Sequence, residues 1–257
     1  MVVVHASDPL GARARFLAAF DKAAELRDRP VRLCDACVMS LPVQRAGISL
    51  HVDGFGMEVL CASDYLAERV EWVQVSLGEG PAWEAVSSGG PVVLADLAHV
   101  DGRWPMFSSE ASASGVGSML AIPLQVGAIK VGVLDLYLDD AQPLDSQDFA
   151  DAMTVADLVT AILLTVGRTG RISETLGPWW DQPLSTREVH QATGMIMAQL
   201  GIDAKDAYVR LQGFAYAGRR LIDDVAHDVV ARRLRFDLDP DPDPDPDPDP
   251  EPSALER

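Results

Sequence analysis

No run of eighteen or more uncharged apolar residues occurs in this sequence of 257 residues, so no segment reaches the length of a membrane-spanning helix. The N-terminal residues also lack a basic residue ahead of their short apolar patch, which excludes the layout of a secretory signal peptide. Only three cysteines are present, too few for a disulfide-rich scaffold and typical of a reducing compartment. We therefore expect a cytoplasmic protein with no membrane partner.

Basic residues are scarce, because the chain has 21 Lys and Arg against 39 Asp and Glu and a net charge of −18. The charge is uneven, with −12 over residues 1–184, +2 over 185–236 and −8 over 237–257. Proteins bind nucleic acids largely through positive contacts to phosphates, so only 185–236 permits such a site. A hydrophobic content of 48% beside 23% charged residues indicates folded domains with proper cores.

The three cysteines are only a weak signal for a metal or redox site. Cys34 and Cys37 form a single C-x-x-C, and Cys61 lies further along the chain. A zinc site needs a second pair or histidines at ligand spacing, whereas the nearest histidine, His51, stands alone. We expect buried structural cysteines and no metal site, with a redox or metal-binding role as the alternative.

The order of elements along residues 30–167 is typical of an α+β domain with an antiparallel sheet and flanking helices. Helical spacing of apolar residues predicts an N-terminal helix within 1–29 and further helices at 31–40, after Pro81 and at 146–166. Alternating apolar residues and turn signals predict strands at 47–53, 56–63, 91–94, 117–126 and 128–138. A short helix or a loop is expected between residues 98 and 114.

The C-terminal third of the chain has a different organisation. Glycine and proline without a clear period mark residues 168–184 as a linker. Residues 185–236 place apolar residues at helical spacing in three short segments, with breaks at Gly201 and Gly218. Helices this short are unstable alone, so they must pack together, on the preceding domain or on another subunit. Alternating Asp and Pro in residues 237–257 predict an extended, disordered acidic tail.

The first domain, residues 30–167, resembles a GAF domain, a small-molecule sensory module. The residues that resemble the family are Gly78-Glu79-Gly80, the run Pro91 to Leu97, and the predicted hairpin of Gly117–Leu124 and Val131–Tyr137. The resemblance implies a ligand site between the sheet and the segment 72–114. Candidates to line that site are the aromatic residues Trp72, Trp83, Trp104 and Phe107, together with Met106. The aromatic residues can equally fill core space. The ligand and any cofactor are unknown from the sequence.

The second domain, residues 185–236, resembles an ANTAR domain, a three-helix RNA-binding module of bacterial antitermination regulators. The matching residues are Gln191-Ala192-x-Gly194-x-Ile196-Met197, then Ala207-x-x-x-Leu211-x-x-x-Ala215, and finally Ile222-x-x-Val225-Ala226. Thr193 stands where the family usually has a lysine. A GAF domain followed by an ANTAR domain is itself a recurring family layout.

Polar residues of this module are candidates for RNA contacts, because RNA is bound through side chains that pair with phosphates or stack on bases. The candidates are Arg187, His190, Gln191, Thr193, Gly194, Arg219 and Arg220. All except Gly194 are expected to be exposed, and each can equally be ordinary solvated surface. Gly194 costs about 1 kcal/mol inside a helix, which favours a close contact with another helix or with RNA.

These resemblances imply a signal-responsive regulator in which the GAF domain controls the binding of the ANTAR domain to nascent RNA stem-loops. The resemblance also implies a homodimer, because two ANTAR modules act together. No catalytic triad, paired carboxylates or phosphate loop is visible, so we do not expect an enzyme. One alternative is a DNA-binding transcription factor with a helix-turn-helix, and another is a thiol enzyme that reduces methionine sulfoxide.

We predict that deletion of residues 239–257 raises the affinity for RNA at low salt. The acidic tail would compete with RNA for the adjacent helical segment, since both are polyanions. The dissociation constants of the full and truncated chains for a stem-loop RNA provide the comparison. Equal dissociation constants would show that the tail does not compete.

Overall fold

The computed structural model describes residues 9–23, 30–52, 56–97, 102–111, 114–167 and 184–236. The predicted linker is almost entirely outside these residues, and so is the predicted Asp-Pro tail. No helix within the described ranges is long and apolar enough to cross a lipid bilayer.

The predicted antiparallel sheet is confirmed, and the fold class is α+β. Its strands are β1 (Arg45–Val52), β2 (Gly56–Ala62), β3 (Val92–Leu94), β4 (Ser118–Val126) and β5 (Ile129–Leu138). The spatial order is β2-β1-β5-β4-β3, and every neighbouring pair is antiparallel. The β4–β5 hairpin turns at Gly127, whose φ of 59° suits glycine. The long β5 strand therefore lies at the centre of the sheet.

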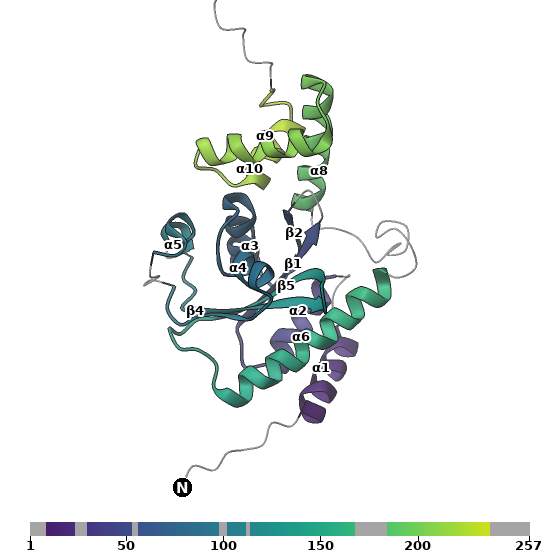
Figure 1. Cartoon of the computed structure of the whole chain (residues 1–257), viewed down its shortest axis with the longest axis vertical. Coiled ribbons are helices and arrows are strands. Elements are labelled where there is room, and N and C mark those ends of the chain that lie inside the picture. Colours follow the sequence, from purple (N-terminus) through teal and green to yellow (C-terminus); the bar gives the residue numbers. More distant parts are fainter. Residues whose placement is uncertain are drawn as a thin grey trace, which may run out of the picture.

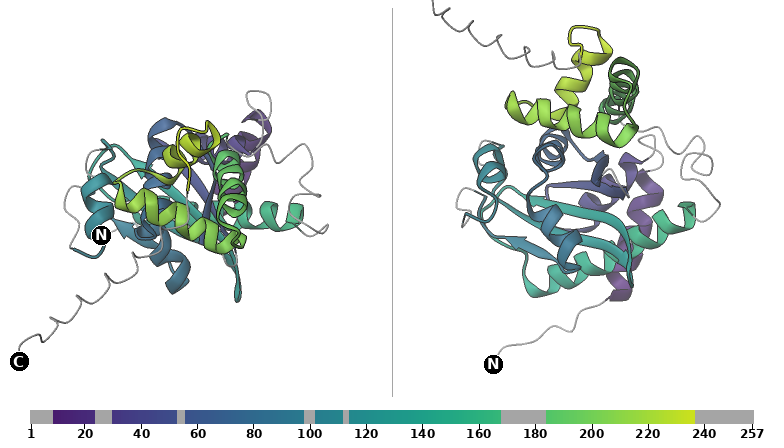
Figure 2. Two further views of the ribbon diagram at one scale, coloured as in Figure 1. Left: turned by 90° about the horizontal axis from the view of Figure 1, so that it is seen from above. Right: turned by 45° about the horizontal axis from the view of Figure 1, so that its top comes forward.

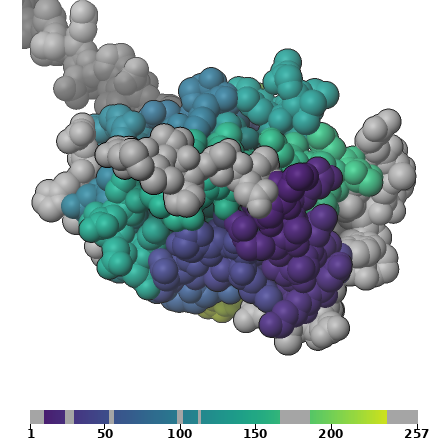
Figure 3. Space-filling view, turned by 90° about the horizontal axis from the view of Figure 1, so that it is seen from below, coloured from purple at the N-terminus to yellow at the C-terminus, as the bar shows by residue number. Residues whose placement is uncertain are grey.

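Both faces of the sheet are covered, since successive side chains of β5 point to opposite faces and are buried on each. Val133 and Tyr137 face one apolar core, while Leu134 and Leu136 face a second core on the opposite side. The second core is closed by α1 (Pro9–Ala23), α2 (Val31–Ser40) and α6 (Ser146–Gly167). Figure 1 shows these three helices below the sheet, and Figure 3 shows α1 and α2 side by side at the surface.

The other face is covered by α3 (Tyr65–Leu77), α4 (Pro81–Ser88) and α5 (Pro105–Ala111). Helix α3 is absent from the sequence-based prediction, which passes directly from the second strand to the segment before Pro81. Asp64 caps its first turn by accepting a hydrogen bond from the Ala67 amide at 2.9 Å. Gly78 ends it in the left-handed region, with φ of 66°.

A buried polar cluster joins α3 to the sheet. Glu71 accepts hydrogen bonds from the hydroxyls of Ser49 (2.5 Å) and Tyr137 (2.7 Å). The Gln74 side chain donates to Asp135 at 2.9 Å. Burial raises the pKa of Asp135 well above its ordinary value, and the nearby Glu71 carboxyl raises it further. The Asp135 carboxyl therefore keeps its proton over a wider pH range than an exposed aspartate.

The three predicted C-terminal helices are present as α8 (Leu184–Leu200), α9 (Ala204–Ala217) and α10 (Ile222–Val230). Asp203 caps α9 by accepting a hydrogen bond from the Asp206 amide at 2.8 Å. Gly201 follows α8 with φ of 67°, as expected of a glycine that ends a helix. Figure 2 shows these helices as a compact group above α3 and β2.

Candidate nucleic-acid interface

The C-terminal helices pack directly on the N-terminal domain and share one apolar core with it. Residues of this core lie on both sides of the contact, namely Met57, Val70 and Val73 from the first domain and Ile196, Leu211 and Ile222 from the second. All six are buried. Because burial of apolar side chains is the main favourable contribution to folding, the contact is part of the folded unit.

Each C-terminal helix, or the residue at its start, makes a hydrogen bond to the N-terminal domain. The three bonds run from Thr186 Oγ1 to the Val59 carbonyl (2.8 Å), from Gln212 Nε2 to the Val75 carbonyl (3.2 Å) and from the Ile222 amide to Ser76 Oγ (2.8 Å). The first and last are buried, where an unmade hydrogen bond costs about 1–3 kcal/mol. The contact is therefore specific in position as well as apolar.

Two ion pairs lie at the edge of this contact. His190 Nε2 of α8 is 3.2 Å from the Glu58 carboxylate of β2, and this hydrogen bond raises the pKa of His190. Arg69 of α3 lies 3.6 Å from the Asp224 carboxylate of α10. These pairs involve partly exposed side chains, so each contributes little to stability.

Asp223 lies at the start of α10, where its carboxyl is mostly buried against the first domain. One of its oxygens, Oδ1, is buried with no hydrogen-bond partner. Burial and the neighbouring Asp224 raise the pKa of Asp223 from 3.8 to about 6. The charged form of this carboxyl is therefore unfavourable in the docked arrangement at neutral pH.

One face of α8 is open to solvent. Arg187, Gln191 and Gly194 are exposed, and their spacing of four and three residues places them in one stripe with His190. A Cβ atom built on Gly194 would meet nothing within 4 Å, so no neighbouring helix in the described chain requires a glycine there. The structure thus brings four of the predicted residues together, in a stripe that an external partner can reach.

Thr193 does not belong to this stripe, and the expectation that it is exposed is wrong. Its side chain is 6% exposed, and its hydroxyl donates to the Val189 carbonyl at 2.8 Å. The reason is helical geometry, since position 193 follows Val189 by one turn on the face that packs against α10 and α9.

Arg219 and Arg220 are also separated from the α8 stripe. They lie in the turn between α9 and α10, beside α3 and α5, whereas the stripe lies beside β2. Arg220 pairs with Asp228 at 2.5 Å, and this contact lowers the pKa of Asp228. The sequence prediction treated the seven residues as one set, but the structure places them in two locations.

Two exposed aromatic residues on α9 were missed by the sequence-based prediction. Phe214 is 41% exposed and Tyr216 is 52% exposed. Phe214 also packs on Phe236, with ring centroids 5.2 Å apart. Exposed aromatic rings beside basic residues are surfaces on which unpaired bases can stack. The signal was present in the sequence, where both aromatic residues closely precede Arg219 and Arg220.

The four aromatic residues predicted to line a ligand site lie in the first domain. Trp72 and Phe107 are fully buried, and Trp104 packs edge-on against Phe107 with ring centroids 6.1 Å apart. Trp83 donates its ring N–H to the Gln74 carbonyl at 2.8 Å. None of the four lines the cavities of about 380 and 260 Å³ beside α3. Their role in ligand binding stays a prediction.

The three cysteines lie in the second core, on the opposite side of the sheet from α3. All three are buried free thiols, with Cys34 Sγ 2.8 Å from Cys61 Sγ, and burial raises the pKa of Cys34 and Cys37. Within the described residues, no group of three or more His, Cys, Asp or Glu side chains could hold a metal ion.

Comparison with known proteins bears on both parts of the chain. A sequence model of the GAF domain matches residues 24–163, more than half of the chain, and a model of the ANTAR domain matches residues 183–230. A search of curated proteins found no match.

Solved structures similar to the chain include two with low sequence identity. The GAF domain of a phosphoenolpyruvate-protein phosphotransferase from Coxiella burnetii is 15% identical, with a TM-score of 0.48, over 64% of this chain and 99% of that chain. Free methionine-R-sulfoxide reductase from Neisseria meningitidis is 17% identical, with a TM-score of 0.45, over 66% of this chain and 99% of that chain.

We predict that Asp223→Asn stabilises the protein at neutral pH but not at acid pH. A carboxyl whose pKa is raised by folding binds its proton more tightly in the native state, so its contribution to stability is complete below pH 4 and is lost as the pH rises through about 6. The amide has no charge to bury. The free energy of unfolding should increase by roughly 1–3 kcal/mol at pH 7.5, and the gain should disappear at pH 4.

Urea unfolding of both proteins between pH 4 and 8 measures this difference. Asp157→Asn, on the exposed side of α6, is the control and should change stability by no more than about 0.5 kcal/mol at any pH. A gain that is independent of pH, or a loss at pH 7.5, would show that the Asp223 carboxylate is not destabilised by burial.

Proposed function

The chain belongs to the GAF domain family and carries an ANTAR domain after it, and we propose on this premise that it is a signal-responsive, RNA-binding regulator of transcription antitermination. In this proposal the GAF domain receives a signal and the ANTAR domain binds nascent RNA stem-loops. Binding there prevents formation of a terminator hairpin. The protein acts by binding and not by catalysis.

The observation that supports this proposal best is the way in which the ANTAR domain is held. Its three helices dock on α3 and β2 through hydrogen bonds, yet the α8 stripe of Arg187, Gln191 and Gly194 stays open. A cation, an amide and a bare backbone position on one helix face suit contacts to phosphates and to splayed bases. A glycine with open space above it lets another molecule approach the helix closely.

Helix α3 supports the second half of the proposal, control of the module by the GAF domain. The Gln74 side chain points to the sheet, while Ser76 and the Val75 carbonyl contact the ANTAR helices. A shift of α3 caused by a ligand would therefore change the docking of α9 and α10. Two such modules, brought together in a homodimer, would bind a pair of stem-loops.

A DNA-binding helix-turn-helix formed by α9 and α10 agrees less well with the way these helices pack on the GAF domain. In that class the N-terminal residues of the second helix enter the major groove. Here the Ile222 amide is bonded to Ser76, and Asp223 is mostly buried against the GAF domain. The exposed Asp224 would, in addition, face DNA phosphates with a like charge.

We predict that the full chain binds an RNA with two stem-loops more tightly than duplex DNA of equal length. Fluorescence anisotropy at two salt concentrations separates the two ligands, because contacts to phosphates weaken with salt. Arg187→Ala should weaken RNA binding by roughly three- to tenfold and should reduce the salt slope by about 1, as expected for one lost phosphate contact.

The matched control is Arg13→Ala, which removes an exposed arginine from α1 on the opposite face of the sheet. This variant should bind RNA as the unchanged chain does. Tighter binding to duplex DNA would contradict the RNA proposal, and equal losses in the two variants would show that the effect is one of net charge.

A further inference from the structure

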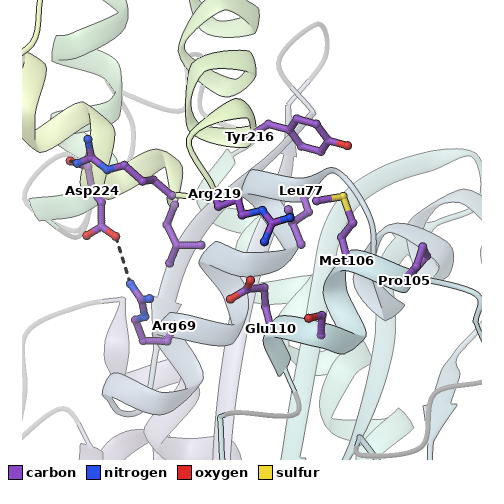
Figure 4. Close-up of a pocket in the computed structure, with 11 residues that line it drawn as sticks. Arg69, Leu77, Pro105, Met106, Glu110, Tyr216, Arg219 and Asp224 are labelled. Atoms are coloured by element: carbon purple, nitrogen blue, oxygen red, sulfur yellow. Dashed lines mark hydrogen bonds and ion pairs between the residues drawn. The ribbon is translucent and has the colours of Figure 1, made fainter.

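A cavity of about 380 Å³ lies between the GAF domain and the ANTAR domain. Figure 4 shows its walls, with Arg69 and Leu77 from α3, Met106 and Glu110 from α5, and Arg219 from the turn after α9. The remaining lining residues are Pro105, Ser109, Tyr216, Arg220, Leu221 and Asp224. Its volume is within the range of small-molecule sites, roughly 300–1,000 Å³, and is too small for a stem-loop.

Most charged groups in this wall already have partners. Arg69 pairs with Asp224 at 3.6 Å, and Arg220 pairs with Asp228 at 2.5 Å. Two groups of opposite charge do not, because neither the Arg219 guanidinium nor the Glu110 carboxylate makes an ion pair or side-chain hydrogen bond within the described chain. The two come from opposite walls, one from each domain, and are not paired with each other.

The backbone of Arg219 ends α9 in the left-handed region. Its φ is 51°, in the left-handed region that favours glycine, while the preceding Gly218 has an ordinary φ of −84°. An arginine is less favourable than glycine at such a position. Arg232, which follows α10, has the same backbone geometry, with φ of 59°, so this conformation belongs to the ends of these helices. At the end of α9 the Arg219 side chain lines the cavity.

Part of the remaining wall is apolar. Leu77, Met106 and Leu221 line the cavity with apolar side chains, and the Tyr216 ring adds an aromatic surface. A ligand that matches these groups has an anionic group for Arg219, a cationic group for Glu110 and an apolar part for the side chains of Leu77, Met106 and Leu221. A free apolar α-amino acid has this combination.

We propose that this cavity binds a free apolar amino acid, with its carboxylate on Arg219 and its ammonium group on Glu110. The ligand would touch both domains and would therefore stabilise their docked arrangement, as any ligand specific for one state does. Arg219 then serves a small molecule and not RNA. Binding itself does not depend on the proposed RNA function; only its effect on RNA affinity does.

Calorimetric titration of the full chain, without RNA, tests the proposal with L-leucine, L-methionine and L-phenylalanine. At least one should bind with a dissociation constant of about 1 mM or tighter and should raise the melting temperature. For L-phenylalanine, two analogues separate the charges, since 3-phenylpropionate lacks the ammonium group and 2-phenylethylamine lacks the carboxylate. Both should bind more weakly than the amino acid.

Arg219→Gly is the informative variant, because glycine adopts the left-handed region and should preserve the turn. It should weaken amino-acid binding by about tenfold or more, as expected when a charged hydrogen bond is lost. Glu110→Gln should weaken binding of the amino acid and of 2-phenylethylamine but not of 3-phenylpropionate.

The matched control is Arg232→Gly. Arg232 also has a positive φ, 59°, is exposed on the same module and does not line the cavity. The Arg232→Gly variant should bind amino acids as the unchanged chain does. The proposal is overturned if none of the three amino acids binds at 10 mM, or if Arg219→Gly and Arg232→Gly bind them equally well. Because RNA is absent, a failed RNA titration leaves these outcomes unaffected.

Discussion

The burial of α3 between the sheet and the ANTAR helices is the constraint on which the rest of the structure depends. A polar group buried on such an enclosed helix is costly when it has no partner, as is the case for the ring N–H of Trp72 among the described residues. Glu71 and Gln74 have partners on the sheet, and Ser76 accepts a hydrogen bond from the Ile222 amide. These contacts together fix the rotation of α3 about its axis and the position of α10 on it.

This arrangement gives the proposed regulator a short physical connection between input and output. Gln74 holds Asp135 of the central strand and also accepts a hydrogen bond from the Ala82 amide of α4. Two residues later on the same helix, Ser76 holds the ANTAR module. A ligand that alters one side of α3 therefore alters the other, and by thermodynamic linkage RNA bound to the module would alter the ligand's affinity equally.

Much of the fold was predictable from sequence, because alternating apolar residues indicate strands and apolar residues at helical spacing indicate helices with one apolar face. Helix α3 was missed because it buries polar residues, Glu71, Gln74 and Ser76, together with apolar ones, so its sequence does not separate into an apolar and a polar face. Asp64 and Gly78 nevertheless marked its two ends. The site was less predictable. Sequence identified exposed candidates such as Arg187, but only tertiary packing shows that Thr193 is buried and that Arg219 faces the GAF domain.

We infer that α3 joins both domains into one cooperative unit. Differential scanning calorimetry of the full chain tests it directly, since a cooperative unit unfolds in a single transition whose calorimetric and van't Hoff enthalpies agree. We expect one such transition. Two separate transitions, with the smaller one arising from the C-terminal helices, would show that the ANTAR domain rests on α3 without sharing its core.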